Sequence, residues 1–184
     1  HRVASSRPIV VMAPGSAHGH AKQWLPERYA EVARRSVIEL GQSVVFVGGI
    51  DDRPVGRAIE SFITEAGHGL SDERQIVNLI GHTDLTELIG ILANCEACVS
   101  NDTGAMHLAA VLSKPVVAVF GPSDERVTAP IGPHELLSHP VRCRPCLLRD
   151  CPIDHRCMIG ISTNDVFSAL VRCLNSNETK EASS

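Results

Sequence analysis

The chain is 184 residues long, 43% hydrophobic and 21% charged, with a formal net charge of −4 at pH 7. This length supports one good hydrophobic core and favours a single domain. The negative charge and the small aromatic content (four Phe, one Trp, one Tyr) argue against a protein that binds nucleic acid. No apolar run approaches the roughly 18 residues of a membrane-spanning helix, and the start HRVASSRPIV has no apolar h-region, so we expect no signal peptide there.

Short apolar runs alternate with helix-like segments along most of the chain. Buried strands are predicted at 7–15, 43–49, 76–81, 97–100 and 115–120. Helices are predicted at 25–41, at 53–67 with an end at Gly67, at 84–95 with an Asp84 cap, from Gly104 onward, and at 162–175. Five strands that alternate with helices predict an α/β fold with a parallel, doubly wound sheet. Right-handed crossovers then bring the loops after the strands to one edge, where a ligand is expected.

Two regions do not follow this alternation. Residues 130–160 are rich in Pro, Arg and Cys, so we expect an irregular segment there. The polar residues 175–184 are expected to form a disordered tail, which leaves one domain over residues 1–174.

The first two loops of the predicted edge carry candidate ligand-binding residues. The segment APGSAHGHAKQW offers the hydroxyl of Ser16 and the positive charge of Lys22, and these two groups could bind a phosphate. The same residue types also occur in ordinary loops. After the second strand, Asp51 or Asp52 stands where an acid often binds a ribose hydroxyl, although capping of the next helix explains either residue equally well.

The fourth loop, SNDTGAMHLAAVLSKPVVAVFGPSD, gives the sharpest signal. Asp102, Thr103 and Gly104 stand at a helix start, and His107 follows one turn later. A helix N-terminus presents free backbone N–H groups, which bind anions. A capping aspartate and a core histidine are the plain alternatives. Together with Lys22 on the same edge, these residues favour a site for a phosphate and a sugar.

Seven cysteines occur in the chain. Cys95, Cys98 and Cys173 have apolar neighbours and are expected to be buried. The other four, in CRPCLLRDCPIDHRC, are Cys143, Cys146, Cys151 and Cys157. Their spacing permits a structural zinc site, with His155 as a further candidate ligand, but it lacks the paired Cys-x-x-Cys knuckles of strong zinc motifs. Reduced thiols and disulfides formed on purification remain as alternatives.

Three segments resemble glycosyltransferase family 9, and within it the ADP-heptose:lipopolysaccharide heptosyltransferases of the heptosyltransferase II type. They are APGSAHGHAKQWLPERYAEVA, SNDTGAMHLAAVLSKPVVAVFGPSD and CRPCLLRDCPIDHRCM, and the resemblance runs from about Pro8 to Leu174. It implies a GT-B enzyme with two Rossmann-like domains, of which this chain is the C-terminal, donor-binding half. The N-terminal acceptor domain, which carries the general base in this family, is expected to be absent, so this chain alone is expected to bind the donor without turnover.

By this resemblance, Lys22 and the backbone N–H groups of Thr103 and Gly104 contact the diphosphate of the donor. His107 lies beside the phosphates, and Asp102 holds hydroxyls of the heptose. Asp51 or Asp52 stands near the ribose. Ser16 and Ala17 occupy positions where the family has small or hydroxyl-bearing residues, and Ala17 cannot donate a side-chain hydrogen bond.

The implied reaction transfers heptose from ADP-heptose to the lipopolysaccharide inner core, on the cytoplasmic face of the inner membrane of Gram-negative bacteria. The resemblance implies no metal cofactor, no nucleic-acid partner and no transmembrane segment, and it predicts no oligomeric state. The alternatives are a family 9 transferase with another nucleotide sugar, a stand-alone nucleotide-binding module, and a metal-stabilised interaction domain.

Overall fold

The computed structural model describes residues 7–66 and 75–181, with side chains up to residue 176. Its centre is a six-stranded, entirely parallel sheet with the strand order β3-β2-β1-β4-β5-β6. The strands are β1 (Ile9–Ala13), β2 (Ser43–Phe46), β3 (Ile76–Asn78), β4 (Ala97–Asn101), β5 (Val116–Phe120) and β6 (His134–Ser138). The helices are α1 (Pro26–Leu40), α2 (Arg53–Glu65), α3 (Leu85–Ala93), α4 (Gly104–Val111), α5 (Glu125–Thr128), α6 (Arg156–Ile159) and α7 (Thr163–Glu181), with short 3-10 turns η1 (His20–Lys22) and η2 (Ile50–Asp52).

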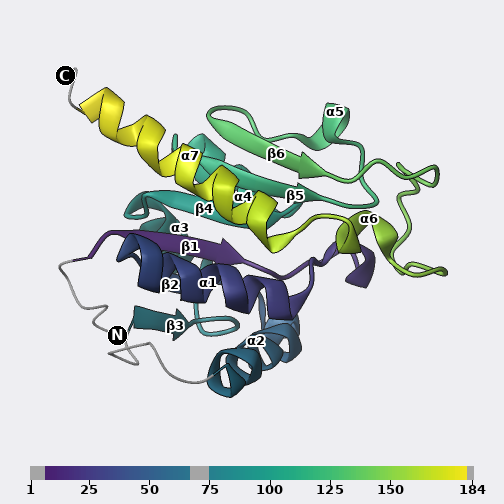
Figure 1. Cartoon of the computed structure of the whole chain (residues 1–184), viewed down its shortest axis with the longest axis horizontal. Coiled ribbons are helices and arrows are strands. Elements are labelled where there is room, and N and C mark those ends of the chain that lie inside the picture. The colour runs from purple at the N-terminus through teal and green to yellow at the C-terminus, as the bar shows by residue number, and fades with distance from the viewer. Residues whose placement is uncertain (1–6, 67–74, 182–184) are drawn as a thin grey trace.

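Helices cover both faces of the sheet, as the doubly wound prediction requires (Figure 1). Alternate residues of each strand point to opposite faces, so the strands feed two separate cores. One core joins Val10, Met12 and their counterparts in the other strands to α1, α2 and α7. The second joins Val11, Ala13 and their counterparts to α3 and α4. This arrangement confirms the Rossmann-like α/β fold.

The predicted elements of the first 120 residues agree with the structure to within a few residues. Helix α1 begins with Pro26 and is followed by Gly41, and Asp84 caps α3 by accepting a hydrogen bond from the backbone N–H of Glu87 at 2.8 Å. Gly67, the expected end of the second helix, lies outside the described residues. Across the described part of the chain, no helix combines the length and apolarity needed to cross a bilayer.

The prediction of five strands was wrong by one, because part of the segment 130–160 is regular. His134–Ser138 forms β6, which pairs in parallel with β5, and Arg156–Ile159 forms α6. The sequence of β6, HELLS, has only two apolar residues, and both are partly exposed at the edge of the sheet. An edge strand does not need the continuous apolar run that identifies a central one.

The prediction of a disordered tail from residue 175 was also wrong for most of its length, because α7 continues to Glu181. The residues after Leu174 are polar, which indicated a segment that packs against nothing. A helix, however, satisfies its backbone hydrogen bonds internally, so a polar extension of a packed helix stays compatible with helical structure.

Candidate functional site

A cavity of about 270 Å³ opens at the carboxyl ends of β1 and β4, where the strand order reverses. Ligands of open α/β sheets bind at this reversal point. The loops that follow β1, β2, β3 and β4 all contribute to the wall, which is lined by Ala13, Gly15, Ser16, Ala17, Val47, Gly48, Gly49, Asp52, Thr83, Asp84, Leu85, Leu88, Thr103, Gly104 and Ala105. The cavity therefore lies at the edge that the sequence predicts.

Lys22 and Asp102 meet at this edge although 80 positions separate them in the chain. The Nζ of Lys22 donates to the Oδ2 of Asp102 at 2.6 Å, and the two side chains are 17% and 5% exposed. An ion pair with so little solvent around it is weakly screened. The structure thus holds one positive and one negative charge side by side, next to the N-terminus of α4.

The start of α4 contributes polar backbone to the cavity. Thr103 is the N-cap residue and makes no side-chain cap hydrogen bond, while its Oγ1 lies 3.1 Å from the Oγ of Ser100. The first backbone N–H groups of a helix have no intrahelical partner. A Cβ added to Gly104 would meet no atom within 4 Å, so this residue faces open space. His107 is exposed and is not among the lining residues, which at this end of the helix are the N-cap residue Thr103 together with Gly104 and Ala105.

Asp52, rather than Asp51, is the acid that reaches the cavity. Its Oδ1 accepts a hydrogen bond from the backbone N–H of Ser16 at 3.0 Å, and its Oδ2 accepts one from Gly49 at 2.9 Å. A Cβ on Gly15 would lie 2.1 Å from the carboxylate carbon, so only glycine permits this approach. Asp51 is exposed outside the lining. Asp52 therefore connects the loop after β1 to the loop after β2 by hydrogen bonds, and it also presents a carboxylate to a ligand.

The hydroxyl of Ser16 is the one polar side-chain atom of the lining that is buried without a hydrogen-bond partner, among the residues that the structure describes. An unsatisfied buried hydroxyl is costly, and a ligand oxygen in the cavity would relieve that cost. The first turn of α3 adds apolar surface to the lining through Leu85 and Leu88. The cavity therefore combines polar groups with apolar surface.

Asn101, which follows the predicted strand 97–100 directly, is not among the candidate site residues of the sequence, whereas the structure makes it the centre of the site's framework. Its side chain is fully buried. The Oδ1 accepts from the backbone N–H of Trp24 at 3.2 Å and from the hydroxyl of Tyr29 at 3.0 Å. The Nδ2 donates to the carbonyls of Pro14 at 2.8 Å and of Gly15 at 3.3 Å. Its place at the end of a central strand, directly before Asp102, is the signal that could have identified it.

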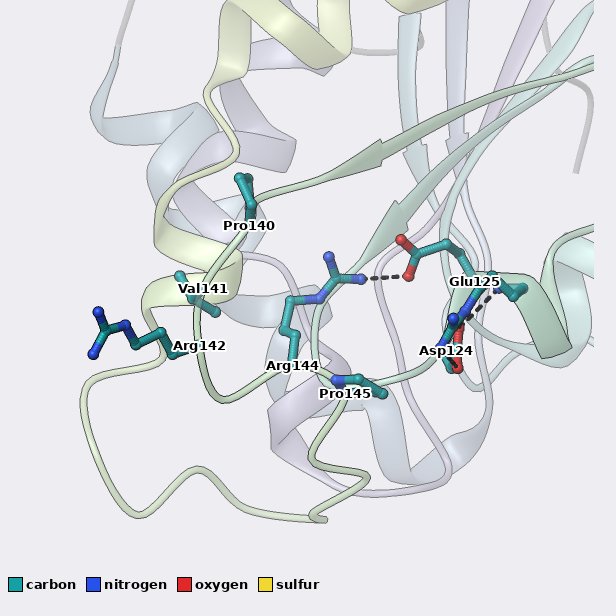
Figure 2. Close-up of a pocket in the computed structure, with 8 residues that line it drawn as sticks. Asp124, Glu125, Pro140, Val141, Arg142, Arg144 and Pro145 are labelled. Atoms are coloured by element: carbon teal, nitrogen blue, oxygen red, sulfur yellow. Dashed lines mark hydrogen bonds and ion pairs between the residues drawn. The ribbon is translucent and has the colours of Figure 1, made fainter.

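A second cavity, of about 480 Å³, lies between α5 and the chain after β6 (Figure 2). Arg144 donates to the carboxylate of Glu125 at 2.7 Å, and Arg126 pairs with Asp124 at the same distance. The hydrogen bond from Arg126 also lowers the pKa of the Asp124 carboxyl below its usual value. Arg142 points away from this group (Figure 2). The positive charges of this cavity are thus largely neutralised by its own walls, which makes it a poorer anion site.

The four clustered cysteines line a small enclosed cavity of about 20 Å³ together with His155 and neighbouring side chains. All seven cysteines of the chain are free thiols, and Cys95, Cys98 and Cys173 are buried as expected. Within the described ranges, no three His, Cys, Asp or Glu side chains form a group that could hold a metal ion. The ring Nε2 of His155 instead lies 2.7 Å from the backbone carbonyl of Ala21.

Thiol reactivity is expected to separate the cysteines into two groups. Burial raises the pKa of Cys95 to about 12 and that of Cys173 to about 11, and it raises the pKa of Cys98 and Cys157 as well. Because the thiolate is the reactive form, these four should react with a chromogenic disulfide only after denaturation. The other three, Cys143, Cys146 and Cys151, are exposed or partly exposed and should react in the native protein.

Titration of the native and the denatured chain with and without a chelator checks this expectation. A zinc site at the cluster would instead protect Cys143, Cys146 and Cys151 until the chelator is added. That result would contradict the arrangement of free thiols and revive the zinc hypothesis.

The parallel sheet, the cavity at its reversal point and the charged pair beside a helix N-terminus define a Rossmann-like ligand-binding domain. Residues 1–156 match the family model described as glycosyltransferase family 9 (heptosyltransferase). The chain belongs to this family.

Curated relatives and solved structures agree with that assignment. Lipooligosaccharide heptosyltransferase 2 of Haemophilus influenzae is 37% identical over 126 residues, which are 68% of this chain and 34% of that protein. Lipopolysaccharide heptosyltransferase 2 of Escherichia coli K12 is 37% identical over 131 residues, or 70% and 35%. The structure of E. coli ADP-heptose lps heptosyltransferase II superposes with a TM-score of 0.79 at 31% identity, covering 95% of this chain and 49% of that one. The matched regions are therefore about a third to a half of these proteins' lengths.

Proposed function

We propose that this chain is the donor-binding part of a glycosyltransferase that transfers heptose from ADP-heptose to the lipopolysaccharide inner core. The observation that carries the proposal is the Lys22–Asp102 ion pair beside the N-terminus of α4, where Asp102 directly precedes Thr103 in the lining of a cavity of about 270 Å³. Family membership and the relatives described above, which are heptosyltransferases, support the choice of sugar and nucleotide.

The chemistry requires stabilisation of a leaving diphosphate. Cleavage of the bond between the anomeric carbon and ADP leaves negative charge on the phosphate oxygens. Lys22 and the backbone N–H groups of Thr103 and Gly104 would supply fixed positive potential to those oxygens. With these groups in place, the proposed reaction requires no metal cofactor. His107 would approach the phosphates only from outside the cavity lining.

Asp102, which directly precedes the lining residue Thr103, and several lining residues fit the other parts of the donor. Asp102 would accept hydrogen bonds from heptose hydroxyls once Lys22 turns toward the phosphates, and Asp52 would do the same for the ribose. The hydroxyl of Ser16 would find its missing partner in a phosphate oxygen. Leu85 and Leu88 would contact the flat face of the base.

Activation of the acceptor hydroxyl needs a general base. We assign that role to a carboxylate of the acceptor-binding domain, which the relatives' additional length accommodates. The chain described here would then bind the donor and contribute no turnover by itself. The reaction would take place at the cytoplasmic face of the inner membrane, where the lipid-linked acceptor is available.

Calorimetric titration of the chain with ADP, UDP and GDP tests this proposal. Binding of ADP is expected to be at least about tenfold tighter than binding of UDP or GDP, a difference of about 1.4 kcal/mol. Preference for UDP or GDP would instead indicate a family 9 transferase with another donor. Failure of all three nucleotides to bind would contradict the donor-binding role of this chain.

A further inference from the structure

The segment that contains the clustered cysteines, residues 139–160, contacts two loops of the sugar-nucleotide edge. The backbone N–H of Leu147 donates to the carbonyl of Pro122 at 3.0 Å, in the loop after β5. The side chain of Arg144 donates to the carbonyls of Gly121 and Ser123 in the same loop. We call residues 139–160 the cysteine segment. The cysteine segment supports the loops at this edge through hydrogen bonds to their backbone groups.

The contact with the first loop centres on Ala21, the residue directly before Lys22. The backbone N–H of Ala21 donates to the carbonyl of Arg149 at 2.9 Å, and its carbonyl lies 2.7 Å from the Nε2 of His155. Ala21 is 3% exposed, so water cannot easily replace these partners. Both polar backbone groups of Ala21 are therefore satisfied by the cysteine segment.

The first loop approaches the cysteine segment so closely that Gly19 is required. Its φ of 111° lies in the region that favours glycine, and a Cβ there would lie 2.4 Å from the carbonyl oxygen of Arg149. The loop that carries Lys22 is thus shaped to fit the cysteine segment.

The tautomer of His155 follows from its partner. A backbone carbonyl can only accept a hydrogen bond, so the ring must carry a hydrogen on Nε2. The backbone of His155 is itself fixed, because its N–H donates to the Sγ of Cys151 at 3.3 Å and its carbonyl accepts from Met158 at 2.9 Å. Met158 is fully buried in the core that packs on α1 and α7. The backbone of His155 is therefore held against the core, and its imidazole contacts the loop that carries Lys22.

We propose that His155 is a positioning residue for Lys22, acting through the carbonyl of Ala21. The inference rests on the proposed function, in which Lys22 binds the diphosphate. A lysine side chain is long and flexible, and ordering it in a complex costs conformational entropy. The hydrogen bonds with Arg149 and His155 fix the backbone of Ala21 beside Lys22, and this restricts the positions that the ammonium group can adopt. Less conformational entropy is then lost when the nucleotide binds.

Two substitutions of His155 separate the hydrogen bond from the backbone conformation. His155 has a φ of 57°, a left-handed conformation that asparagine tolerates well. His155→Asn keeps that tolerance but is too short to reach the Ala21 carbonyl, whereas the longer amide of His155→Gln places a donor near the former Nε2. The matched control is His134→Ala, because the Nδ1 of His134 also lies 2.8 Å from a backbone carbonyl, that of Gly132, at the amino end of β6.

ADP titration of these variants and of Lys22→Ala tests the inference. His155→Asn is expected to raise the Kd for ADP by about fivefold, an effect typical of one lost hydrogen bond. His155→Gln should recover most of the affinity, and His134→Ala should bind as the unsubstituted chain does. In the Lys22→Ala background, His155→Asn should have no further effect, because the two residues act through the same contact.

The outcomes distinguish this inference from the proposed function. If the unsubstituted chain binds no ADP, or if Lys22→Ala binds it unchanged, the proposed function fails and the inference fails with it. If Lys22→Ala weakens binding but His155→Asn does not, only the positioning role is overturned. If His155→Asn weakens ADP binding equally in the unsubstituted chain and in the Lys22→Ala background, His155 has a general structural role. That result would also overturn the inference. Should His155→Asn fail to fold, His155→Gly removes the imidazole and adopts the φ of 57° without strain, so its effect on the Kd with and without Lys22→Ala decides in the same way.

Discussion

Replacement of Asn101 by alanine is expected to lower the free energy of unfolding by about 3–5 kcal/mol. The side chain is fully buried and makes four hydrogen bonds within the chain. Its removal leaves the backbone N–H of Trp24 and the carbonyl of Pro14 buried without their partners, and each such group costs about 1–3 kcal/mol. Urea unfolding, followed by circular dichroism, measures the loss.

Two further variants make the Asn101 result interpretable. Asn101→Asp retains an acceptor but loses both donors and buries a charge, so it should be no more stable than Asn101→Ala. Asn94→Ala is the matched control, because Asn94 is exposed and makes one side-chain hydrogen bond, to the carbonyl of Gly90 at 2.8 Å. It should change stability by less than about 0.5 kcal/mol. Equal losses for Asn94→Ala and Asn101→Ala would contradict the central role of Asn101.

The fold is readable from the sequence wherever burial imposes a pattern on it. Strands β1, β2, β4 and β5 are almost entirely buried, and their sequences are mainly apolar. The edge strand β6 packs only partly and leaves too weak a pattern to be recognised. Helix α7 extends into polar residues because backbone hydrogen bonds, which any residue except proline can make, suffice to continue a helix.

The site is predictable in its location but less so in its contacts. Parallel topology alone brings the loops of Lys22 and Asp102 to one edge, so the sequence predicts their proximity. It does not distinguish Asp51 from Asp52, because both follow the same strand and only the turn of η2 decides which one points at Ser16. The hydrogen bond between His155 and Ala21 joins residues 134 positions apart, and no local pattern encodes such a contact.

Lys22→Ala is expected to weaken ADP binding by about 10- to 100-fold, since hydrogen bonds to charged groups contribute about 1.5–3 kcal/mol. The variant removes the ammonium group that would face the diphosphate, and it leaves the buried Asp102 carboxylate unpaired beside the incoming phosphates. Both effects act in the same direction. Calorimetry with ADP gives the change in Kd, and Lys114→Ala is the matched control, because Lys114 precedes β5 at the opposite edge of the sheet.

Asp102→Asn separates an electrostatic role of the pair from a structural one. In the unliganded chain, Lys22 is bound to Asp102 at 2.6 Å, so ADP must compete with this carboxylate for the ammonium group. The asparagine still accepts a hydrogen bond from Lys22 but carries no charge that repels the phosphates. Asp102→Asn should therefore bind ADP about two- to fivefold more tightly, an effect of the size expected for a partly screened charge.

The two variants thus change ADP affinity in opposite directions. A site damaged merely by loss of the ion pair would bind ADP more weakly in both variants, because either substitution removes the charge of one partner. Opposite signs require the positive charge at Lys22 to act on the nucleotide itself. With ADP-heptose in place of ADP, the gain for Asp102→Asn should disappear, because the sugar hydroxyls then lose the carboxylate that accepts their hydrogen bonds.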